Sequence, residues 1–405
     1  MFVEVVIFII LGVFIGFLTG LAPGIHPNTI FAMVLSLSFL FVWLPIQVLL
    51  AFAVSLAVSN TFFDFIPSII FGAPEEDSVL STLPGHRMLL KGRGYEAIFL
   101  TVVGGLGVML LTIISLPAML FTLPMINEAI RSIMHIILAS VVIWMMLGEK
   151  KRIAAVFIFF ASGIFGFITL NSFSSDVMMF PALTGLFGIS TLLTSIMART
   201  KIPKQKTGVE VRAEWLKGTL TGWFAGLLAG LLPGLGSSQT GIIASRFTGA
   251  KIKEFMITLG GINTSNIFFT FVVFYVVGKT RSGAAWFISQ IVDQLTFQDL
   301  ALLVAVGIIT SLVSAVLTLR TAGFLLRKMK DVNYTKITAA TLMALVFLVS
   351  VLSGPIGLLV SAAGMFLGLL TISLGVKRIH MMGFLVFPTI MYFSGLNSLL
   401  FTILW

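Results

Sequence analysis

Long apolar stretches alternate with short polar ones along the whole of this chain. An apolar run of about 18 or more residues can cross a bilayer as a helix, so the pattern predicts an all-α polytopic membrane protein. The expected spans form one set in each half of the chain. They are 46–73, 97–122, 131–148, 153–171 and 178–198 in the first half, and 255–278, 300–320, 336–353, 356–375 and 380–403 in the second.

A break rich in Gly and Pro precedes each set of spans, and we call each break a knot. The first knot, 16–29, reads Gly-Phe-Leu-Thr-Gly-Leu-Ala-Pro-Gly-Ile-His-Pro-Asn-Thr, and the second, 226–240, reads Gly-Leu-Leu-Ala-Gly-Leu-Leu-Pro-Gly-Leu-Gly-Ser-Ser-Gln-Thr. A backbone break at membrane depth is tolerated where it is buried in protein or lines a wet cavity. The apolar arms beside the knots are too short to cross comfortably, which predicts two re-entrant hairpins of broken helix. These arms are 5–22, 30–42, 218–233 and 237–249.

The two halves also match beyond the knots. Residues 60–72 align without gaps with 266–278, 206 positions later, and share an Asn, three Phe and a Gly at the same places. The chain is therefore expected to hold two repeats, 1–198 and 218–405, joined by a basic linker at 199–217. Because each half has a hairpin and an odd number of spans, the second half must lie upside down. Inverted-topology repeats with broken helices are typical of secondary transporters.

The distribution of Lys and Arg gives the orientation. Short cytoplasmic loops carry an excess of positive charge. With the N-terminus outside, every basic residue except Arg131, Lys279 and Arg281 falls in an inner loop. The sequence therefore predicts a multi-pass protein of the cell membrane with both termini external.

The composition supports a membrane protein and excludes several classes of function. The 405 residues are 58% hydrophobic and 10% charged, with a mean hydropathy of +1.12, whereas soluble domains are about 25% charged. The net charge of +10 lies in short loops where it sets orientation, so no nucleic-acid partner is expected. The absence of cysteine excludes cysteine nucleophiles and thiolate metal sites. Because no H-E-x-x-H, G-x-S-x-G or Walker pattern is present, the chain is not expected to be an enzyme.

The knots are the expected substrate-binding site. N–H groups at the start of a helix carry partial positive charge and bind anions. His26 adds a group that titrates near neutral pH, whereas His86, His135 and His380 are expected to be structural. The alternative is that each Pro-Gly pair only kinks a helix for packing, but two matched breaks favour a transporter's binding site. The predicted substrate-binding residues are Pro23, Gly24, His26, Asn28, Thr29, Pro233, Gly234, Gly236, Ser237, Ser238, Gln239 and Thr240.

Asp64 is an acidic residue placed well inside a predicted span, on the same helical face as Asn60. A carboxylate inside the membrane is expensive and marks a functional site, here for a coupling proton or sodium ion. The alternative is that it lies near the inner interface and pairs with a loop Arg. In the second half, amide and hydroxyl oxygens suit a small hard cation, a substrate or a hydrogen bond between helices. The predicted coupling-ion residues are Asp64, Asn60, Asn263, Thr264 and Asn266.

The polar loop expected at 74–96 carries a family resemblance. Together with Gly-Leu-Ala-Pro-Gly in the first knot, it resembles the large permease subunit of tripartite tricarboxylate transporters, the TctA family. Members of that family carry a Gly-x-x-Pro-Gly knot in each half and a loop reading Ser-Val-x-x-Thr-x-Asp-Gly-x-x-Met-x-x-x-Gly-Arg-x-x-x-Ala. The resemblance continues through Pro233-Gly-Leu-Gly and Phe180-Pro-Ala-Leu-Thr-Gly-Leu-Phe-Gly, and the chain is similar to a compact, archaeal-type branch. The loop pattern is held by Ser78, Val79, Thr82, Gly85, Met88, Gly92, Arg93 and Ala97, while the family's Asp falls on Pro84.

The resemblance implies a secondary active transporter for tri- or dicarboxylates, coupled to protons or sodium. It also implies two partners, a small membrane subunit and an external solute-binding protein. We expect a small anionic substrate between the two hairpins, and no cofactor other than a coupling ion. The alternative is a polyprenyl-phosphate (lipid-phosphate) translocase, which resembles the same design of paired re-entrant hairpins. A channel or a membrane scaffold explains the duplicated knots less well.

The orientation can be tested directly because the chain has no native cysteine. We predict that Lys204 is cytoplasmic and that 280–282 is external. In intact cells, Ser282→Cys should react with a membrane-impermeant maleimide, and Lys204→Cys should react only after the membrane is permeabilised. The reverse labelling pattern would rule out the inverted-repeat arrangement.

Overall fold

The protein is predominantly helical in the part of the chain that the computed structural model describes. Those residues are 2–22, 27–36, 43–72, 79–131, 133–172, 175–197, 203–206, 215–231, 236–248, 251–280, 282–328 and 334–396, and no strand occurs among them. In these ranges, eight helical segments are long and apolar enough to cross a membrane. Helices satisfy their own backbone hydrogen bonds in lipid. The all-α polytopic class is therefore confirmed.

The chain forms two compact units, and each unit takes segments from both sequence halves. Unit 1 comprises 1–71, 80–125 and 202–332, and unit 2 comprises 72–79, 126–201 and 333–405. The compact units thus do not follow the linker at 199–217. The two repeats expected from the sequence, 1–198 and 218–405, stay a prediction about duplication.

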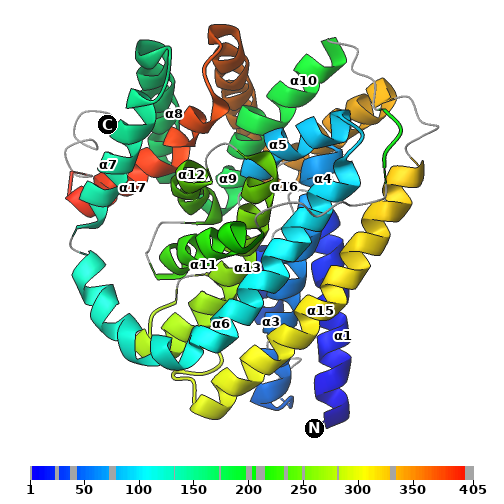
Figure 1. Ribbon diagram of the computed structural model, residues 1–405, viewed down its shortest axis with the longest axis vertical. Helices are drawn as coiled ribbons and strands as arrows, with labels where there is room; N and C mark the ends of the chain where they lie inside the picture. Colours follow the sequence, from blue (N-terminus) through cyan, green and yellow to red (C-terminus); the bar gives the residue numbers. More distant parts are fainter. Residues whose placement is uncertain are drawn as a thin grey trace. The chain divides into compact units, whose positions relative to one another are not determined.

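Unit 1 is built around two central helices, α3 and α13, which are buried along most of their length. Helices that are apolar all round occupy such interior positions. α1 lies along α3, and α11 lies along α13 (Figure 1). The helices of unit 1 are α1 (Phe2–Leu21), α2 (Pro27–Ser36), α3 (Ile46–Phe63), α4 (Phe65–Ile70), α5 (Val79–Leu90), α6 (Gly94–Arg131, which continues into unit 2), α11 (Trp215–Leu231), α12 (Ser237–Phe247), α13 (Ile252–Val277), α14 (Gly283–Ser289) and α15 (Phe297–Lys328).

Unit 2 pairs helices from opposite halves through glycines. A Cβ built on Gly163 would lie 2.6 Å from that of Phe387, and one built on Gly364 would lie 2.9 Å from the carbonyl oxygen of Ala182. Gly354 (φ 63°, ψ −161°) breaks α16 where the sequence predicts a boundary between two spans. The elements of unit 2 are α7 (Met134–Leu147), α8 (Arg152–Ser172), α9 (Ser175–Leu183), the π-helix η2 (Thr184–Ile189), α10 (Ser190–Met197), α16 (Tyr334–Leu374), the 3-10 helix η4 (Arg378–Met382) and α17 (Gly383–Ser394).

One helix-pair contact occurs in both halves of unit 1. Glycines of α1 pack on α3, and a Cβ built on Gly16 would lie 2.7 Å from the Cβ of Ser59. Glycines of α11 pack on α13 in the same way. Small residues let membrane helices approach closely. Because the contacts join equivalent positions, they support the duplication. The matched pairs are Gly12–Ser55 with Gly222–Gly261, Gly16–Ser59 with Gly226–Ser265, and Gly20–Phe63 with Gly230–Phe269.

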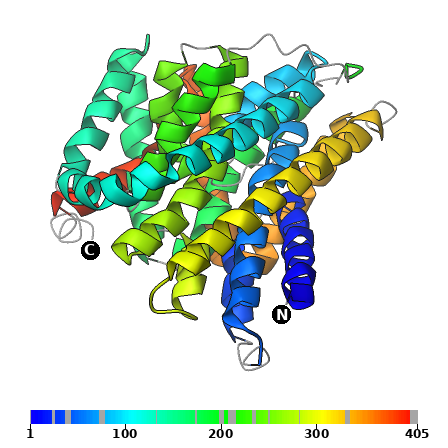
Figure 2. The same ribbon diagram turned by 60° about the horizontal axis from the view of Figure 1, so that its bottom comes forward.

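A second set of contacts exchanges helices between the halves. α6 of the first half packs on α13 of the second, and α15 of the second half packs on α3 of the first (Figure 2). Each of these contacts in one half has a counterpart between the equivalent residues of the other half. A two-fold relation between the two halves of unit 1 requires this correspondence. The direction of that axis relative to the membrane, and so the inverted topology, stays a prediction. The matched pairs are Val54–Gly307 with Gly260–Thr101, and Ser55–Thr310 with Gly261–Gly104.

Two expectations about the elements were wrong. α1 has 20 residues and is long enough to cross a membrane, so the short-arm argument for the first hairpin does not hold. The glycines of α1 do not interrupt the helix, and they allow it to pack closely on α3.

The expected polar loop at 74–96 contains the helix α5, in which Gly85, Met88 and Leu89 are buried. This spacing places them on one helical face, and that face packs inward. The re-entrant hairpins themselves stay a prediction.

The exchanged contacts should be sensitive to a single added methyl group. A Cβ on Gly260 would collide with the carbonyl oxygen of Thr101, whereas a Cβ on the helical Gly323 would meet no atom closer than 3.6 Å. We expect Gly260→Ala to lower the free energy of unfolding by about 1–3 kcal/mol. The matched control Gly323→Ala should be neutral or stabilising. Thermal unfolding of the detergent-purified variants measures both, and equal melting temperatures would contradict the α6–α13 crossing.

Candidate functional site

The candidate site begins at a break in a central helix. α3 ends at Phe63 and α4 begins at Phe65, and Asp64 lies between them with its side chain almost fully buried. Pro67 explains the break, because proline has no N–H to donate to the carbonyl of Phe63 and its ring crowds that carbonyl. Residues 46–70 still form one candidate membrane span, as the sequence predicts, and Asp64 lies at the junction of its two helical segments.

Asp64 joins the two halves of unit 1 by a direct hydrogen bond. The side-chain amide of Asn263, on α13, donates to its carboxylate over 2.7 Å. Nearby on the same pair of helices, the hydroxyls of Thr61 and Thr264 lie 3.3 Å apart. A buried carboxylate needs donors such as this amide to offset its lost hydration. Two of the predicted coupling-ion residues therefore meet, although they are far apart in the sequence.

The duplicated asparagines connect the central helices to the arms of the knots. Asn60 donates to the hydroxyl of Thr19 on α1 over 3.1 Å, and Asn266 donates to the hydroxyl of Ser237 on α12 over 3.5 Å. α1 ends just before the first knot's Pro-Gly pair, and α12 begins just after that of the second. Both asparagines thus hold a helix end next to a Pro-Gly break.

The other predicted substrate-binding residues fall into three groups. Asn28, in the first turn of α2, is exposed and lies against Gly283 at the start of α14. Ser237, Ser238 and Thr240 are buried in the first turn of α12, which Gly236 precedes. Thr29 and Gln239 lie within α2 and α12. Outside the described residues lie Pro23, Gly24, His26, Pro233 and Gly234.

The site departs from the two-fold relation at its most polar contact. The positions equivalent to Asp64 and Asn263 are Thr270 and Ala57, both buried. Thr270 forms no side-chain hydrogen bond with other described residues. α13 also runs unbroken through its equivalent of the Asp64 break. One half therefore carries both the charge and the helix break.

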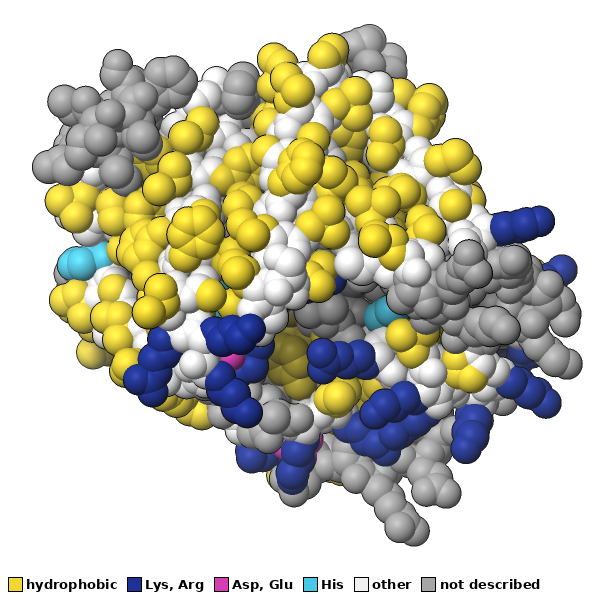
Figure 3. All heavy atoms as spheres, turned by 90° about the horizontal axis from the view of Figure 1, so that it is seen from above, with side chains coloured by type: hydrophobic (Ala, Val, Ile, Leu, Met, Phe, Trp, Pro, Cys, Tyr) yellow, Lys and Arg dark blue, Asp and Glu magenta, His cyan; other side chains and the backbone are white. Residues whose placement is uncertain are grey.

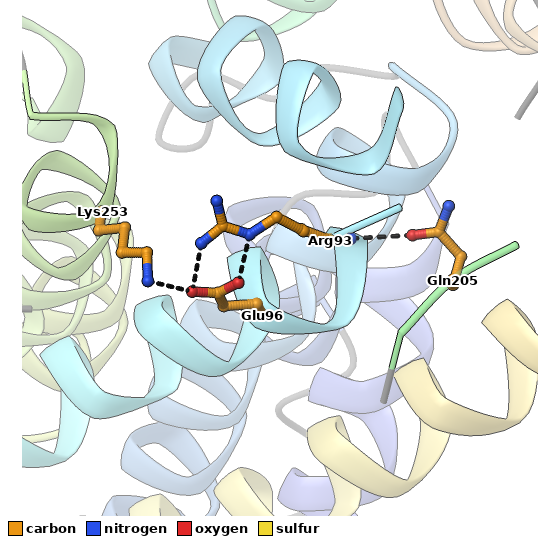
Figure 4. Close-up of polar contacts among 5 residues, drawn as sticks. Arg93, Glu96, Gln205 and Lys253 are labelled. Atoms are coloured by element: carbon orange, nitrogen blue, oxygen red, sulfur yellow. Dashed lines mark hydrogen bonds and ion pairs between the residues drawn. The ribbon is translucent and has the colours of Figure 1, made fainter. Parts of the chain in front are cut away.

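An ion-pair cluster that the sequence analysis missed fastens the start of α6. Glu96 receives two hydrogen bonds from Arg93, at 2.6 and 2.7 Å, and an ion pair from Lys253 at 2.7 Å (Figure 4). The side chain of Gln205 accepts a hydrogen bond from the N–H of Gly94 over 2.9 Å. The cluster ties both halves and segment 203–206 together. The family loop pattern includes Arg93, but nothing in its spacing identifies partners more than a hundred residues away.

Two of the three histidines expected to be structural lie in protein contacts. Nδ1 of His86 lies 3.2 Å from the carbonyl oxygen of Ile69. Burial lowers the pKa of His86 more than this contact raises it, so it is neutral at neutral pH. His380 is buried, and its Nε2 lies 3.3 Å from Glu149. His135 is half-buried in α7.

Comparison with known families settles the class of the protein. The model of the tripartite tricarboxylate transporter TctA family matches residues 6–383. The chain belongs to the TctA family. This family is the permease component of tripartite transporters, so the protein is a transporter permease and not an enzyme. The resemblance seen in the knots and the 74–96 loop is confirmed.

A relative in an archaeon agrees with the compact branch of the family. An uncharacterized protein of Methanocaldococcus jannaschii is 28% identical over 400 residues, which cover 96% of this chain and 98% of that protein. No solved structure matches the chain. This relative therefore has nearly the same length as the present chain.

The Asp64–Asn263 contact can be tested by exchanging its two members. Asn263→Asp would place two carboxylates side by side, and we expect it to lose roughly 1.5–3 kcal/mol of stability. Adding Asp64→Asn restores one amide and one carboxylate, so the double variant should regain most of that loss. Thermal unfolding in detergent measures the recovery.

The matched control uses Asn266, whose amide contacts Ser237 instead. Adding Asp64→Asn to Asn266→Asp should give no recovery. If the exchange at 263 recovers no more stability than the exchange at 266, the contact between Asp64 and Asn263 is wrong.

Proposed function

We propose that this TctA-family chain is an ion-coupled secondary transporter for carboxylate-bearing organic anions. The single observation that carries the proposal is the buried Asp64 carboxylate, held by an amide from the other half of unit 1. A carboxylate inside a membrane-spanning helix is costly and is retained where an ion or proton is moved. The family match supports tri- or dicarboxylates as the substrate class.

The substrate is proposed to lie between the two knots. Ser237 and Ser238 bring hydroxyls into the first turn of α12, and the start of a helix favours an anion. The asparagines at 60 and 266 position the adjacent helix ends. In this arrangement the two halves contribute to one anion site, and His26, Pro23, Gly24, Pro233 and Gly234 are its proposed members in the knots themselves.

The coupling ion is proposed to bind at Asp64. A proton or a sodium ion would neutralise the carboxylate during the transport cycle and so reduce the cost of its burial. Asn263 and Thr264 lie on the facing helix and supply polar oxygens and donors. Because Asn60 lies one turn from Asp64 and also contacts α1, occupancy of the ion site has a direct route to the first knot.

The lipid-phosphate alternative is less well supported. It rests on paired re-entrant hairpins, and α1 is long enough to cross a membrane by itself. The family description names tricarboxylates.

We also propose that the protein works with the family's two partners, a small membrane subunit and an external solute-binding protein. Both termini are proposed to lie on the external side of the cell membrane.

Transport assays on Asp64→Asn test the coupling. The amide mimics a neutralised carboxylate, so we expect the variant to bind and exchange substrate but not to accumulate it above the external concentration. The assay uses purified protein in liposomes, labelled tri- and dicarboxylates, and imposed proton or sodium gradients.

The matched control is Thr270→Val, at the equivalent position of the other half, which should keep concentrative uptake. Unchanged accumulation in Asp64→Asn would move coupling to His26 or to no residue at all. Uptake that polyprenyl phosphate blocks and that no carboxylate supports would favour the alternative function.

A further inference from the structure

A basic groove lies on the surface of unit 2, outside the proposed transport site. It runs between the turn that joins α7 to α8 and the C-terminal end of α16, and its volume is about 1240 Å³. The residues of the proposed transport site belong to unit 1. The groove therefore needs its own explanation.

The groove combines two kinds of side chain. Three consecutive cations, Lys150, Lys151 and Arg152, contribute to its lining. Apolar side chains also line it, and among them Ile153 is 89% exposed and Phe157 is 55% exposed. Figure 3 shows a face on which Lys and Arg side chains lie directly beside hydrophobic ones. A site with cations beside exposed apolar groups suits a ligand with an anionic head and an apolar tail.

The positive charge of the groove is not cancelled from within. Glu149 also lines it, but this carboxylate is buried and already engaged by Lys377 and His380, each at 3.3 Å. Burial raises the pKa of Glu149, but hydrogen bonds from His380 and the Lys150 N–H, together with Lys377, outweigh it and hold the pKa below its ordinary value. The negative charge of Glu149 is thus compensated by Lys377 and His380, and not by the three cations of the groove.

The three cations face the groove with little internal competition. The ammonium of Lys151 donates to the carbonyl oxygen of Leu374 over 2.8 Å, which fixes it at the end of α16. Lys150 and Arg152 form no ion pair with any other described residue. Cations that form no ion pair attract an anion more strongly than cations that are already paired with carboxylates.

The bilayer supplies a ligand of the matching chemistry. α8 is a membrane-spanning candidate that begins at Arg152, so Lys150, Lys151 and Arg152 lie where the span meets the lipid headgroups. Basic pockets at this depth bind anionic lipid headgroups. A soluble carboxylate would use the cations but leave Ile153 and Phe157 exposed to water. The apolar wall therefore favours a lipid over a soluble acid.

We propose that this groove binds an anionic phospholipid, with its phosphate held by Lys150, Lys151 and Arg152 and an acyl chain lying along Ile153, Phe157 and Leu370. The site is separate from substrate binding. It attaches unit 2 to the surrounding lipid at the start of α8.

Native mass spectrometry of the purified full chain tests the proposal with phosphatidylglycerol and phosphatidylcholine as probes. We expect the wild-type protein to retain phosphatidylglycerol preferentially. Replacing Lys150, Lys151 and Arg152 by Gln should weaken that binding roughly tenfold or more. The matched control replaces Arg320, Arg327 and Lys328, three exposed basic residues of α15, by Gln. It removes the same charge elsewhere and should keep the preference.

A second variant guards against misfolding of the triple substitution. Ile153→Glu adds a negative charge in the first turn of α8, where it suits the helix but repels a phosphate. It should fold normally and lose phosphatidylglycerol. Retention of this lipid by the triple variant and Ile153→Glu, or equal binding of both lipids by the wild type, would overturn the proposal. Displacement of the lipid by glycerol phosphate at comparable concentration would overturn it too, because the groove would then be a soluble-anion site.

Discussion

Close approach of helix backbones at glycine is the constraint on which unit 1 depends. Lipid gives helices no hydrophobic reason to associate, so packing contacts and interhelical hydrogen bonds must hold them together. Gly104 and Gly260 let α6 and α13 cross with their backbones in contact. Next to that crossing, Gly105 leaves the space in which Thr264 and Phe62 meet. The polar contacts of the site are therefore positioned by residues that have no side chain.

The same contacts give unit 1 its internal two-fold relation, and the site is where that relation fails. Glycine pairs recur at equivalent positions, and α6 and α15 exchange partners reciprocally. Asp64 and Asn263 have only Thr270 and Ala57 as their equivalents. A symmetric site would bury two carboxylates and double the desolvation cost. A duplicated scaffold with a single charge keeps the packing of the repeat and limits that cost to one group.

The sequence predicts the class and the repeat better than the architecture. Apolar runs and matched glycines are local signals, so they identified most helices and the duplicated segments. The two compact units mix both halves, and no local pattern reports which helices exchange partners. Asp64, Asn60, Asn263 and Thr264 stood out because polar residues are rare in apolar spans. Thr19, Thr61 and the Glu96 cluster were missed, because a threonine or a loop ion pair carries meaning only once its distant partner is known.

The position of the charge and the position of the helix break coincide, and the chemistry of proline explains why that matters. Because Pro67 has no N–H, the carbonyl of Phe63, the residue before Asp64, lacks its helical donor. In the other half the residue equivalent to Pro67 is Val273, which has an N–H, and α13 continues through it. Carbonyl and carboxylate oxygens are the ligands that small hard cations prefer. The half that carries the charge thus also carries the carbonyl that lacks its helical donor, an asymmetry that fits the coupling-ion site proposed at Asp64.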